Sequence, residues 1–266
     1  MKTTAVINLK GGVAKTITAA NLAHILTTVF GKRVLIIDND KQGNTSKMFG
    51  VHGYEQYTLS EILTHQCDIE ETIRHTRYEN LDVIPANMTL LKANMAVMMD
   101  STRPQQTRIK KALLKVAERY DYCIIDNAPD INISVINALV ACDDVIIPIK
   151  IDQFAFDGLD QLTEQIEQTR EDLNPNIRLT GCVITSYVNN EVNKQGKQWL
   201  IENHYPIFNT HIRRTEKVDE STFARVPIIE YSRRCGAARD YLRFAKEYLD
   251  KTMLSDLDNG QGADHE

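Results

Sequence analysis

Several short runs of this 266-residue chain are apolar at every position, and they constrain the fold more than any other feature. Val34–Ile37 and Cys123–Ile125 contain no polar residue, whereas a strand with one face in water would alternate apolar and polar side chains. Strands covered on both faces are typical of a parallel sheet with helices on either side. The pattern predicts strands at Thr4–Leu9, Arg33–Asp38, Leu81–Pro85, Tyr122–Asp126, Val145–Ile149 and Leu179–Thr185.

The segments between these strands have helical periodicity. One apolar face runs through Ala19, Leu22, Ala23, Leu26 and Phe30. Gly31 is well placed to end that helix. Further helices are predicted at Ile109–Tyr120, Phe156–Leu173 and Ala237–Leu249. Alternating strands and helices predict a doubly wound, mostly parallel α/β sheet that binds its ligand at the carboxyl ends of the strands.

The chain shows no repeat, linker or second domain. We expect a single domain over residues 1–252. Residues 253–266 are acidic, and from Asp256 onward they contain two glycines and no apolar periodicity. This composition predicts a disordered tail.

The first predicted strand leads directly into a glycine-containing loop and a helix. Such a loop aims successive backbone N–H groups at one point, where an anion is held. Within Lys10–Thr16, Lys15 would reach the outer phosphates of a nucleotide and the Thr16 hydroxyl would ligate Mg²⁺. The common motif G-x-x-x-x-G-K-[ST] is not met, because Leu9 and Ala14 occupy its glycine positions. The alternative is a glycine turn that binds no nucleotide, and two further motifs disfavour it.

Two other predicted strands end in acidic residues. Asp38 and Asp40 stand two residues apart at a strand end, where both side chains would point to the same side. Four apolar residues precede Asp126, the pattern of a Walker B aspartate that holds Mg²⁺ through water. The alternatives are a solvated turn at Asp38–Asp40 and an aspartate that caps the following helix, a role that Asp130 suits better than Asp126.

Together these motifs resemble the ParA/MinD family of deviant Walker ATPases. The family pattern K-G-G-x-x-K-[ST] is met in full by Lys10, Gly11, Gly12, Lys15 and Thr16. The resemblance implies that Lys10 reaches the active site of a partner subunit across an ATP-bridged dimer. It also implies that Asp40 orients or activates the attacking water, while Asp38 helps to set the geometry of Mg²⁺ and Thr16.

The resemblance extends from Thr3 to Asp250 and implies further contacts to ATP. The expected loop contacts are Lys10, Gly11, Gly12, Val13, Ala14, Lys15, Thr16 and Ile17. Ile212–Thr215 resembles the adenine-side segment I-P-R-N, so Arg213 and Arg214 are the expected base contacts, although Arg213 replaces proline. Another family segment has the pattern P-x-x-x-E, and Asp152 lies close to the position of its glutamate.

The chain departs from the family at three places near the phosphates. Ala14 stands where glycine is usual, while Lys41 and Ala128 stand where prolines are usual. A methyl group at position 14 would crowd the phosphates if the backbone there needs a positive φ.

Composition excludes several kinds of protein. The five cysteines form no C-x-x-C pair, so neither a disulfide framework nor a zinc site is indicated. Cys123 and Cys182 are expected as small buried hydrophobes. No segment has the about 18 to 20 apolar residues that cross a bilayer, and the N-terminal residues lack the order of a signal peptide. We therefore expect a cytoplasmic protein.

Membrane-binding members of the family end in a basic amphipathic helix, whereas this chain ends in Asp256, Asp258, Asp264 and Glu266. Tyrosine-kinase members carry a C-terminal tyrosine cluster and iron–sulfur members carry closely spaced cysteines, which this sequence lacks. Partition members bind DNA without sequence preference through the C-terminal half. The formal net charge of −5 leaves room for this, because basic residues outnumber acids between Arg213 and Lys246. The candidates for DNA contact are Lys194, Lys197, Lys217, Arg233 and Arg234, each of which taken alone could be an ordinary surface residue.

The resemblance thus predicts a Mg-ATP-dependent ATPase that dimerises with ATP and then binds non-specific DNA on the nucleoid to drive partition. A ParB-like centromere-binding adaptor would stimulate its slow hydrolysis. Two alternatives remain open: a nucleotide-gated binding module with little hydrolysis, and a positioning ATPase for a cargo other than DNA.

Overall fold

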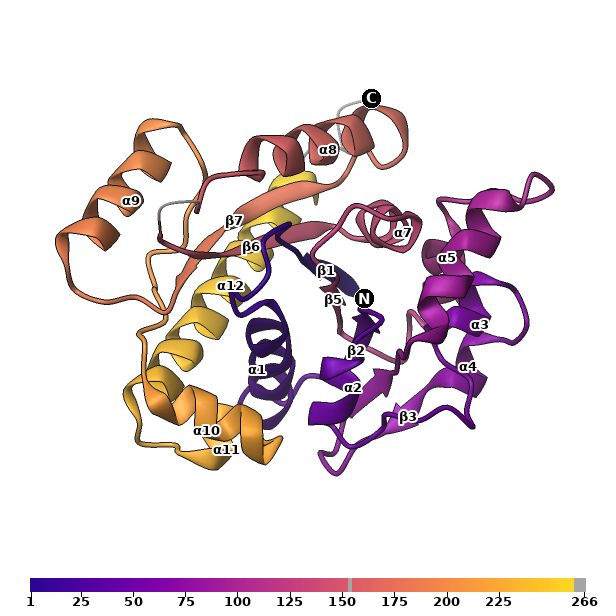
Figure 1. Cartoon of the computed structure of the whole chain (residues 1–266), viewed down its shortest axis with the longest axis horizontal. Coiled ribbons are helices and arrows are strands. Elements are labelled where there is room, and N and C mark those ends of the chain that lie inside the picture. The colour runs from indigo at the N-terminus through magenta and orange to yellow at the C-terminus, as the bar shows by residue number, and fades with distance from the viewer. Residues whose placement is uncertain (153–154, 261–266) are drawn as a thin grey trace.

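A computed structural model describes residues 1–152 and 155–260 of the chain. Its centre is a seven-stranded sheet with the order β3-β4-β2-β5-β1-β6-β7 (Figure 1). The strands are β1 (Lys2–Val6), β2 (Val34–Asn39), β3 (Arg74–His75), β4 (Leu81–Ile84), β5 (Tyr122–Asn127), β6 (Asp144–Lys150) and β7 (Arg178–Thr185). Every neighbouring pair is parallel except β3 with β4. The predicted doubly wound, mostly parallel sheet is confirmed.

All six predicted strands are present, with ends that differ from the predictions by at most three residues. The largest difference is in β1, which was predicted to extend to Leu9 but ends at Val6. Beyond Val6 the chain leaves the sheet, because the Asn8 side chain donates to the Pro148 carbonyl at 2.8 Å and accepts from the Lys10 N–H at 2.8 Å. Strand β3 was not predicted, since two residues carry no periodic pattern.

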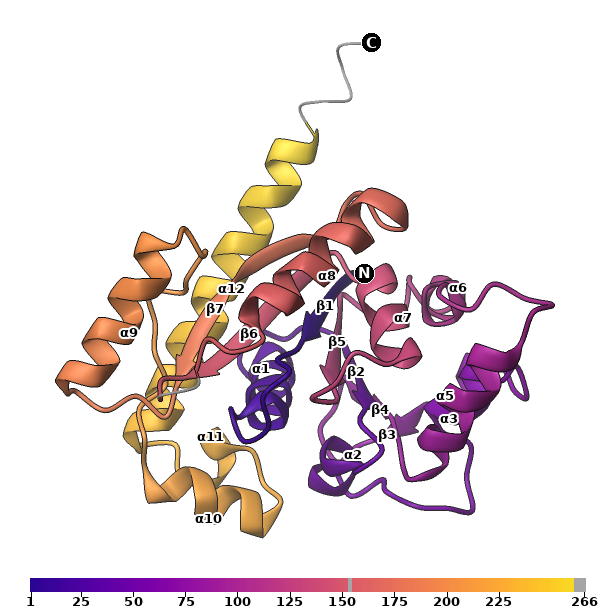
Figure 2. The ribbon, with the colours of Figure 1, turned by 45° about the horizontal axis from the view of Figure 1, so that its top comes forward.

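Helices cover both faces of the sheet (Figures 1 and 2). In the first half they are α1 (Lys15–Thr28), α2 (Asn44–Met48), α3 (Leu59–Leu63), α4 (Ile69–Thr72), α5 (Thr89–Met99) and α6 (Arg108–Leu114). In the second half they are α7 (Ile133–Ala141), α8 (Leu159–Asp172), α9 (Glu191–Glu202), α10 (Glu216–Ala224), α11 (Ile228–Tyr231) and α12 (Gly236–Gly260).

The apolar strands contribute side chains to the hydrophobic cores on both faces of the sheet, because successive side chains point to opposite faces. Val34 and Ile36 of β2 pack in one cluster with residues of α1 and α12. Leu35 and Ile37 pack in another with residues of α3, α5 and α6. Cys123 and Cys182 lie fully buried in β5 and β7, as the sequence predicted.

The helix ends differ from the predictions in two informative places. Helix α6 ends at Leu114 instead of Tyr120, because the next residues form tight turns such as Val116 N–H to the Leu113 carbonyl at 3.1 Å. Helix α12 continues to Gly260, so helical backbone extends through residues 253–260, where disorder was predicted. Each added helical residue contributes one more backbone hydrogen bond, which favours this extension. Residues 261–266 of the predicted tail lie outside the described residues.

No helix in the described part of the chain combines the length and apolar character needed to span a bilayer.

His24 on α1 gives the fold a testable dependence on pH. Its side chain is buried edge-on against Tyr78, with ring centroids 4.6 Å apart, and its Nδ1 has no hydrogen-bond partner among the residues that the structure describes. Burial lowers the pKa of His24 from 6.5 to about 4. Between these values the unfolded chain binds a proton that the folded chain does not, so stability falls as the pH decreases. The slope contributed by His24 reaches at most about 1.4 kcal/mol per pH unit.

We predict that His24→Gln flattens this acid dependence, because glutamine does not titrate. Urea unfolding at several pH values between 4 and 7.5 measures the slope in the variant and the parent. His204→Asn is the matched control, since His204 is exposed and asparagine tolerates its left-handed backbone. An equal slope in His24→Gln and the parent would contradict the assignment.

Candidate functional site

The carboxyl ends of β1, β2 and β5 meet at one edge of the sheet, and the predicted phosphate loop lies there. The loop follows β1 and ends where α1 begins at Lys15. A cavity of about 440 Å³ opens beside it. The lining residues are Gly11, Gly12, Ala14, Lys15, Thr16, Ile17, Asp40, Asn44, Lys47, Met48, Pro129, Thr222 and Arg225.

Hydrogen bonds to β6 and β7 fix the conformation of the loop. The Val13 carbonyl accepts a hydrogen bond from the Thr185 hydroxyl of β7 at 3.1 Å, and Asn8 ties the loop to β6. The Val13 side chain is buried, so only its backbone can contribute to a ligand contact. Ile17, by contrast, lines the cavity.

Ala14 adopts the left-handed conformation, so position 14 does require the positive φ that the sequence analysis considered. Its φ is 64° and its ψ is 33°, and it serves as the N-cap of α1. Glycine adopts this conformation without steric cost, whereas a Cβ atom costs about 1 kcal/mol or more. The loop therefore carries strain that a glycine would remove.

Lys15 is buried at the base of the cavity. Its Nζ donates to the Lys10 carbonyl at 2.9 Å, within the loop itself. Burial lowers the pKa of Lys15, and the negative charges of Asp126, Asp40 and Asp130 oppose that shift. The ammonium thus lies in the field of three carboxylates, close to where phosphates would enter.

Asp38 and Asp126 are direct neighbours in the parallel pairing of β2 with β5, and both are buried. Burial, and then the charge of Asp126, raises the pKa of Asp38 to about 8. Asp38 Oδ2 accepts hydrogen bonds from the Ser46 N–H at 2.8 Å and the Ser46 hydroxyl at 2.6 Å. Asp38 therefore anchors the start of α2 beneath the cavity.

Asp40 does not share that environment. Strand β2 ends at Asn39, so Asp40 lies just beyond the strand that holds Asp38, and the prediction that both carboxylates point to the same side stays a prediction. Asp40 lines the cavity, and one of its oxygens accepts from the Gln42 N–H at 2.9 Å. It is the carboxylate placed to face an incoming ligand.

The residues present fit a Mg²⁺ ion. Asp126 Oδ2 accepts from the Thr45 hydroxyl at 2.8 Å, whereas Asp126 Oδ1 is buried without any partner in the described residues. Burial raises the pKa of Asp126 to about 6, and hydrogen bonds from the Thr45 and Thr16 hydroxyls counteract that rise. Mg²⁺ takes few protein oxygens and retains waters and phosphates. The described residues contain no cluster of three or more His, Cys, Asp or Glu side chains that could hold a metal ion.

Lys10 forms an ion pair with Asp152 of its own chain. The Lys10 side chain remains about one quarter exposed, at 27%. Asp152 therefore restrains the amine that the family resemblance assigns to a partner subunit.

The alternative in which Asp130 caps the helix after β5 is wrong. Asn132 is the N-cap of α7, and its side chain accepts from the Ser134 and Val135 N–H groups.

A smaller cavity of about 230 Å³ adjoins the same loop and contains the predicted base contacts. Gly12 and Ala14 line both cavities, and Arg213 and Arg214 line the smaller one. Arg213 donates through Nε and Nη2 to the buried Asp240, at 2.7 and 3.0 Å. A Cβ at Gly236 would lie 2.5 Å from the Arg213 side chain, so the glycine leaves room for the residue that replaces proline.

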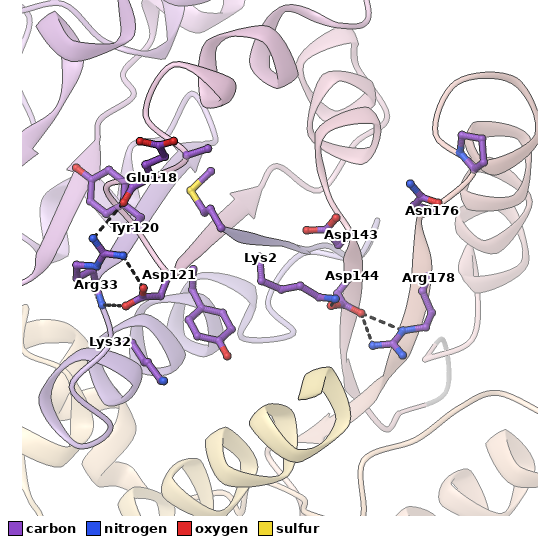
Figure 3. Close-up of a pocket in the computed structure, with 14 residues that line it drawn as sticks. Lys2, Lys32, Arg33, Glu118, Tyr120, Asp121, Asp143, Asp144, Asn176 and Arg178 are labelled. Atoms are coloured by element: carbon purple, nitrogen blue, oxygen red, sulfur yellow. Dashed lines mark hydrogen bonds and ion pairs between the residues drawn. The ribbon is translucent and has the colours of Figure 1, made fainter. Parts of the chain in front are cut away.

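The larger cavity on the opposite edge of the sheet has a different character (Figure 3). It measures about 1380 Å³, and its charged side chains pair with one another. Arg33 contacts Asp121 at 2.8 Å, while Arg178 contacts Asp144 at 2.7 Å. The phosphate loop lies at the other edge, so size alone does not identify the site.

The predicted DNA contacts lie on separate elements of the C-terminal half. Lys194 and Lys197 are on α9, Lys217 begins α10, and Arg233 and Arg234 lie between α11 and α12 (Figure 1). Lys217 pairs with Glu220 at 2.7 Å, which offsets part of its charge. Further basic residues follow the exposed side of α12, at Arg239, Arg243 and Lys246.

Several residues of the site carry no sequence signal of their own. Thr45 and Ser46 bind the two buried carboxylates, and Lys47, Thr222 and Arg225 line the cavity. The run Asn44–Ser46 is rich in residues that favour helix starts, which was the one local indication available. Arg225 comes from a segment distant in sequence, which only the fold brings to the loop.

Comparison with known proteins shows similarity along most of the chain. A family model described as an AAA domain matches residues 1–179. The chain is 34% identical over 252 residues to the sporulation initiation inhibitor protein Soj of Bacillus subtilis, with 92% of this chain and 97% of that protein covered. It is 31% identical over 256 residues to the chromosome partitioning protein ParA of Caulobacter vibrioides, with 94% and 95% covered.

A solved structure agrees with the fold. Cobyrinic acid a,c-diamide synthase from Mycobacterium smegmatis, with a bound ATP analogue and magnesium, superposes with a TM-score of 0.81. The two chains are 27% identical, and 94% of each is covered.

The strain at Ala14 leads to a direct test of the loop. We predict that Ala14→Gly stabilises the protein by about 0.5 to 1 kcal/mol, because glycine removes the left-handed strain but adds some entropy to the unfolded chain. Urea unfolding measures the change. Ala224→Gly, at an exposed helical position of α10, should destabilise by a similar amount. Destabilisation by Ala14→Gly would show that the methyl group packs favourably in the loop.

Proposed function

Because the chain belongs to the ParA-type family of P-loop ATPases, we propose that it binds and hydrolyses Mg-ATP and uses this cycle to drive DNA partition. One observation carries the proposal more than any other. The buried Asp126 Oδ1 has no protein partner in the described residues, and it lies beside the Thr16 hydroxyl and within the field of Lys15. A cation bound beside this oxygen would offset the cost of burying the carboxylate, and a P-loop supplies one together with the nucleotide.

In this proposal different residues bind the phosphates, hold Mg²⁺ and orient the attacking water. The loop N–H groups and Lys15 would bind the phosphates, while Thr16 and Asp126 would hold Mg²⁺, with Asp38 anchoring α2 from below. Bound Mg²⁺ would neutralise charge on the phosphate oxygens. Asp40, which lines the cavity, would orient the attacking water. The Arg213–Arg214 segment would border the adenine.

Hydrolysis at such a site is governed by position and charge. The water oxygen forms a bond to the γ-phosphorus while the bond from that phosphorus to the bridging oxygen breaks. The electron pair of the broken bond stays on ADP, and a water proton passes to the released phosphate. The cations around the phosphates stabilise the negative charge that shifts toward the bridging oxygen.

In this proposal two copies of the chain close on two ATP molecules, and each copy supplies Lys10 to the other. The ion pair with Asp152 is then the resting position of Lys10, which must exchange one anionic partner for another. The closed dimer joins the basic residues of two C-terminal halves, so that the number of phosphate contacts to non-specific DNA doubles.

A cytoplasmic protein of this kind would associate with the nucleoid in its ATP state, and a ParB-like adaptor would stimulate hydrolysis. The matched relative named as a chromosome partitioning protein supports the partition role.

The first test concerns the nucleotide. We predict that Lys15→Ala weakens Mg-ATP binding by on the order of 100-fold or more, because it removes the buried cation from the phosphates. Titration calorimetry with Mg-ATP measures the affinity. Lys41→Ala is the control, because Lys41 is a nearby lysine that does not line the cavity. Undiminished affinity in Lys15→Ala would remove the nucleotide from this loop.

The second test concerns the dimer. We predict that Lys10→Ala binds one ATP per chain but loses ATP-dependent dimerisation, hydrolysis and DNA binding together, because its amine acts on the facing subunit. Light scattering with and without Mg-ATP measures the dimer. Asp152→Asn frees Lys10 from its own-chain partner and should still dimerise, and Lys32→Ala at the opposite edge of the sheet serves as the charge control. A Lys10→Ala chain that dimerises and binds DNA like the parent would refute the shared-lysine mechanism.

A further inference from the structure

Arg225, at the end of α10, lines the nucleotide cavity together with residues of the phosphate loop. Thr222 of α10 and Asp40, Asn44 and Lys47 line the same cavity. Helix α10 comes from the C-terminal half of the chain and α2 from the N-terminal half (Figure 2). The fold therefore brings a cation from a remote segment to the cavity that Asp40 lines.

Each of the other two cations of this cavity gives one hydrogen bond to a backbone carbonyl. Lys15 donates to the Lys10 carbonyl, and Lys47 donates to the Gln42 carbonyl at 2.6 Å. The Arg225 side chain is exposed and has no ion pair with any side chain in the described part of the chain. Its five N–H donors are consequently available to an anion that enters the cavity.

The backbone of Arg225 is in an unusual state for such a residue. Arg225 is the C-cap of α10 with φ 55° and ψ 46°, the left-handed conformation that glycine usually supplies at the end of a helix. An arginine in this place is strained, and such strain is concentrated at functional sites. The helix end would be more stable with glycine, so the side chain needs a reason other than local structure.

The effect of the Arg225 charge on His52 agrees with a position of Arg225 near the loop that carries Asp40. The positive charges of Lys47 and Arg225 both lower the pKa of His52, after the larger effect of burial. The His52 ring packs against Gly43, where an added Cβ would lie 2.6 Å from it. Arg225 thus acts on the loop that carries Asp40, although the two are 185 positions apart in the sequence.

We propose that Arg225 is a further catalytic residue of this site, a cation supplied by the same chain that contacts the γ-phosphate and stabilises it during transfer. The inference rests on the proposed function. As the bond to the bridging oxygen breaks, negative charge spreads over the γ-phosphoryl oxygens and the leaving ADP, and the guanidinium fork is matched to these oxygens. Its contribution is larger in the transition state than in the bound ATP state, so it acts on kcat more than on affinity.

The test compares Arg225→Ala, Arg225→Lys and Arg225→Gly in the full chain. ATP affinity is measured by calorimetry with Mg-ATP, and kcat is measured by phosphate release with and without DNA. We expect Arg225→Ala and Arg225→Gly to lose on the order of 100-fold in kcat while affinity changes by less than about threefold. Arg225→Lys restores the charge without the fork and should recover part of the loss.

The glycine variant separates catalysis from structure. Relief of the left-handed strain should raise the unfolding midpoint of Arg225→Gly by about 2 to 4 °C while hydrolysis still falls. Millimolar guanidinium chloride should restore part of its activity, because the ion can occupy the place of the lost side chain. His204→Gly is the matched control, since His204 has φ 59° and lies outside the cavity. It should gain stability with unchanged hydrolysis.

Two outcomes overturn the inference while leaving the proposed function intact. The first is parental hydrolysis in Arg225→Gly, which would make the residue a strained surface arginine. The second is a loss of ATP affinity with unchanged kcat, which would restrict Arg225 to ground-state binding. A parent chain that neither binds nor hydrolyses Mg-ATP would instead remove the proposed function itself.

Discussion

The parallel pairing of β2 with β5 sets Asp38 beside Asp126, and the rest of the site depends on how these two buried carboxylates are accommodated. Two like charges out of water are costly unless hydrogen bonds or cations compensate them. Ser46 satisfies Asp38, and Thr45 satisfies one oxygen of Asp126. The other oxygen of Asp126 is buried and has no hydrogen-bond partner in the described residues, and in the proposed function this oxygen faces the bound Mg²⁺.

Ala14 and Arg225 both line the cavity that results, and both have positive φ without being glycine. Glycine would be the unstrained choice at either place. At Ala14 the strain belongs to the loop that would surround the phosphates, and at Arg225 it comes with a charged side chain. Because His65, Asn80, Ser186 and His204 also have positive φ and do not line this cavity, the strain supports a functional site only together with the lining.

The structure also explains one departure from the family pattern. Arg213 stands where the resemblance would place a proline, and an arginine there needs both space and a counter-charge. Gly236 supplies the space and Asp240 the counter-charge, both from the start of α12. The substitution is thus compensated by a pair of residues more than twenty positions away in the sequence. Arg213 and Gly12 line the same small cavity, so this compensation acts beside the predicted phosphate loop.

The sequence by itself determined the layers of the fold and predicted where the phosphate loop would lie. Apolar runs report burial on both faces of a strand, and a glycine turn between a strand and a helix reports an anion site, because both effects act between residues close in the chain. Strand order, the inward turn of Asp38, the ion pair of Lys10 with Asp152 and the approach of Arg225 were decided by tertiary structure. Each of these depends on contacts between distant segments, and on backbone angles that residue type does not specify for alanine or arginine.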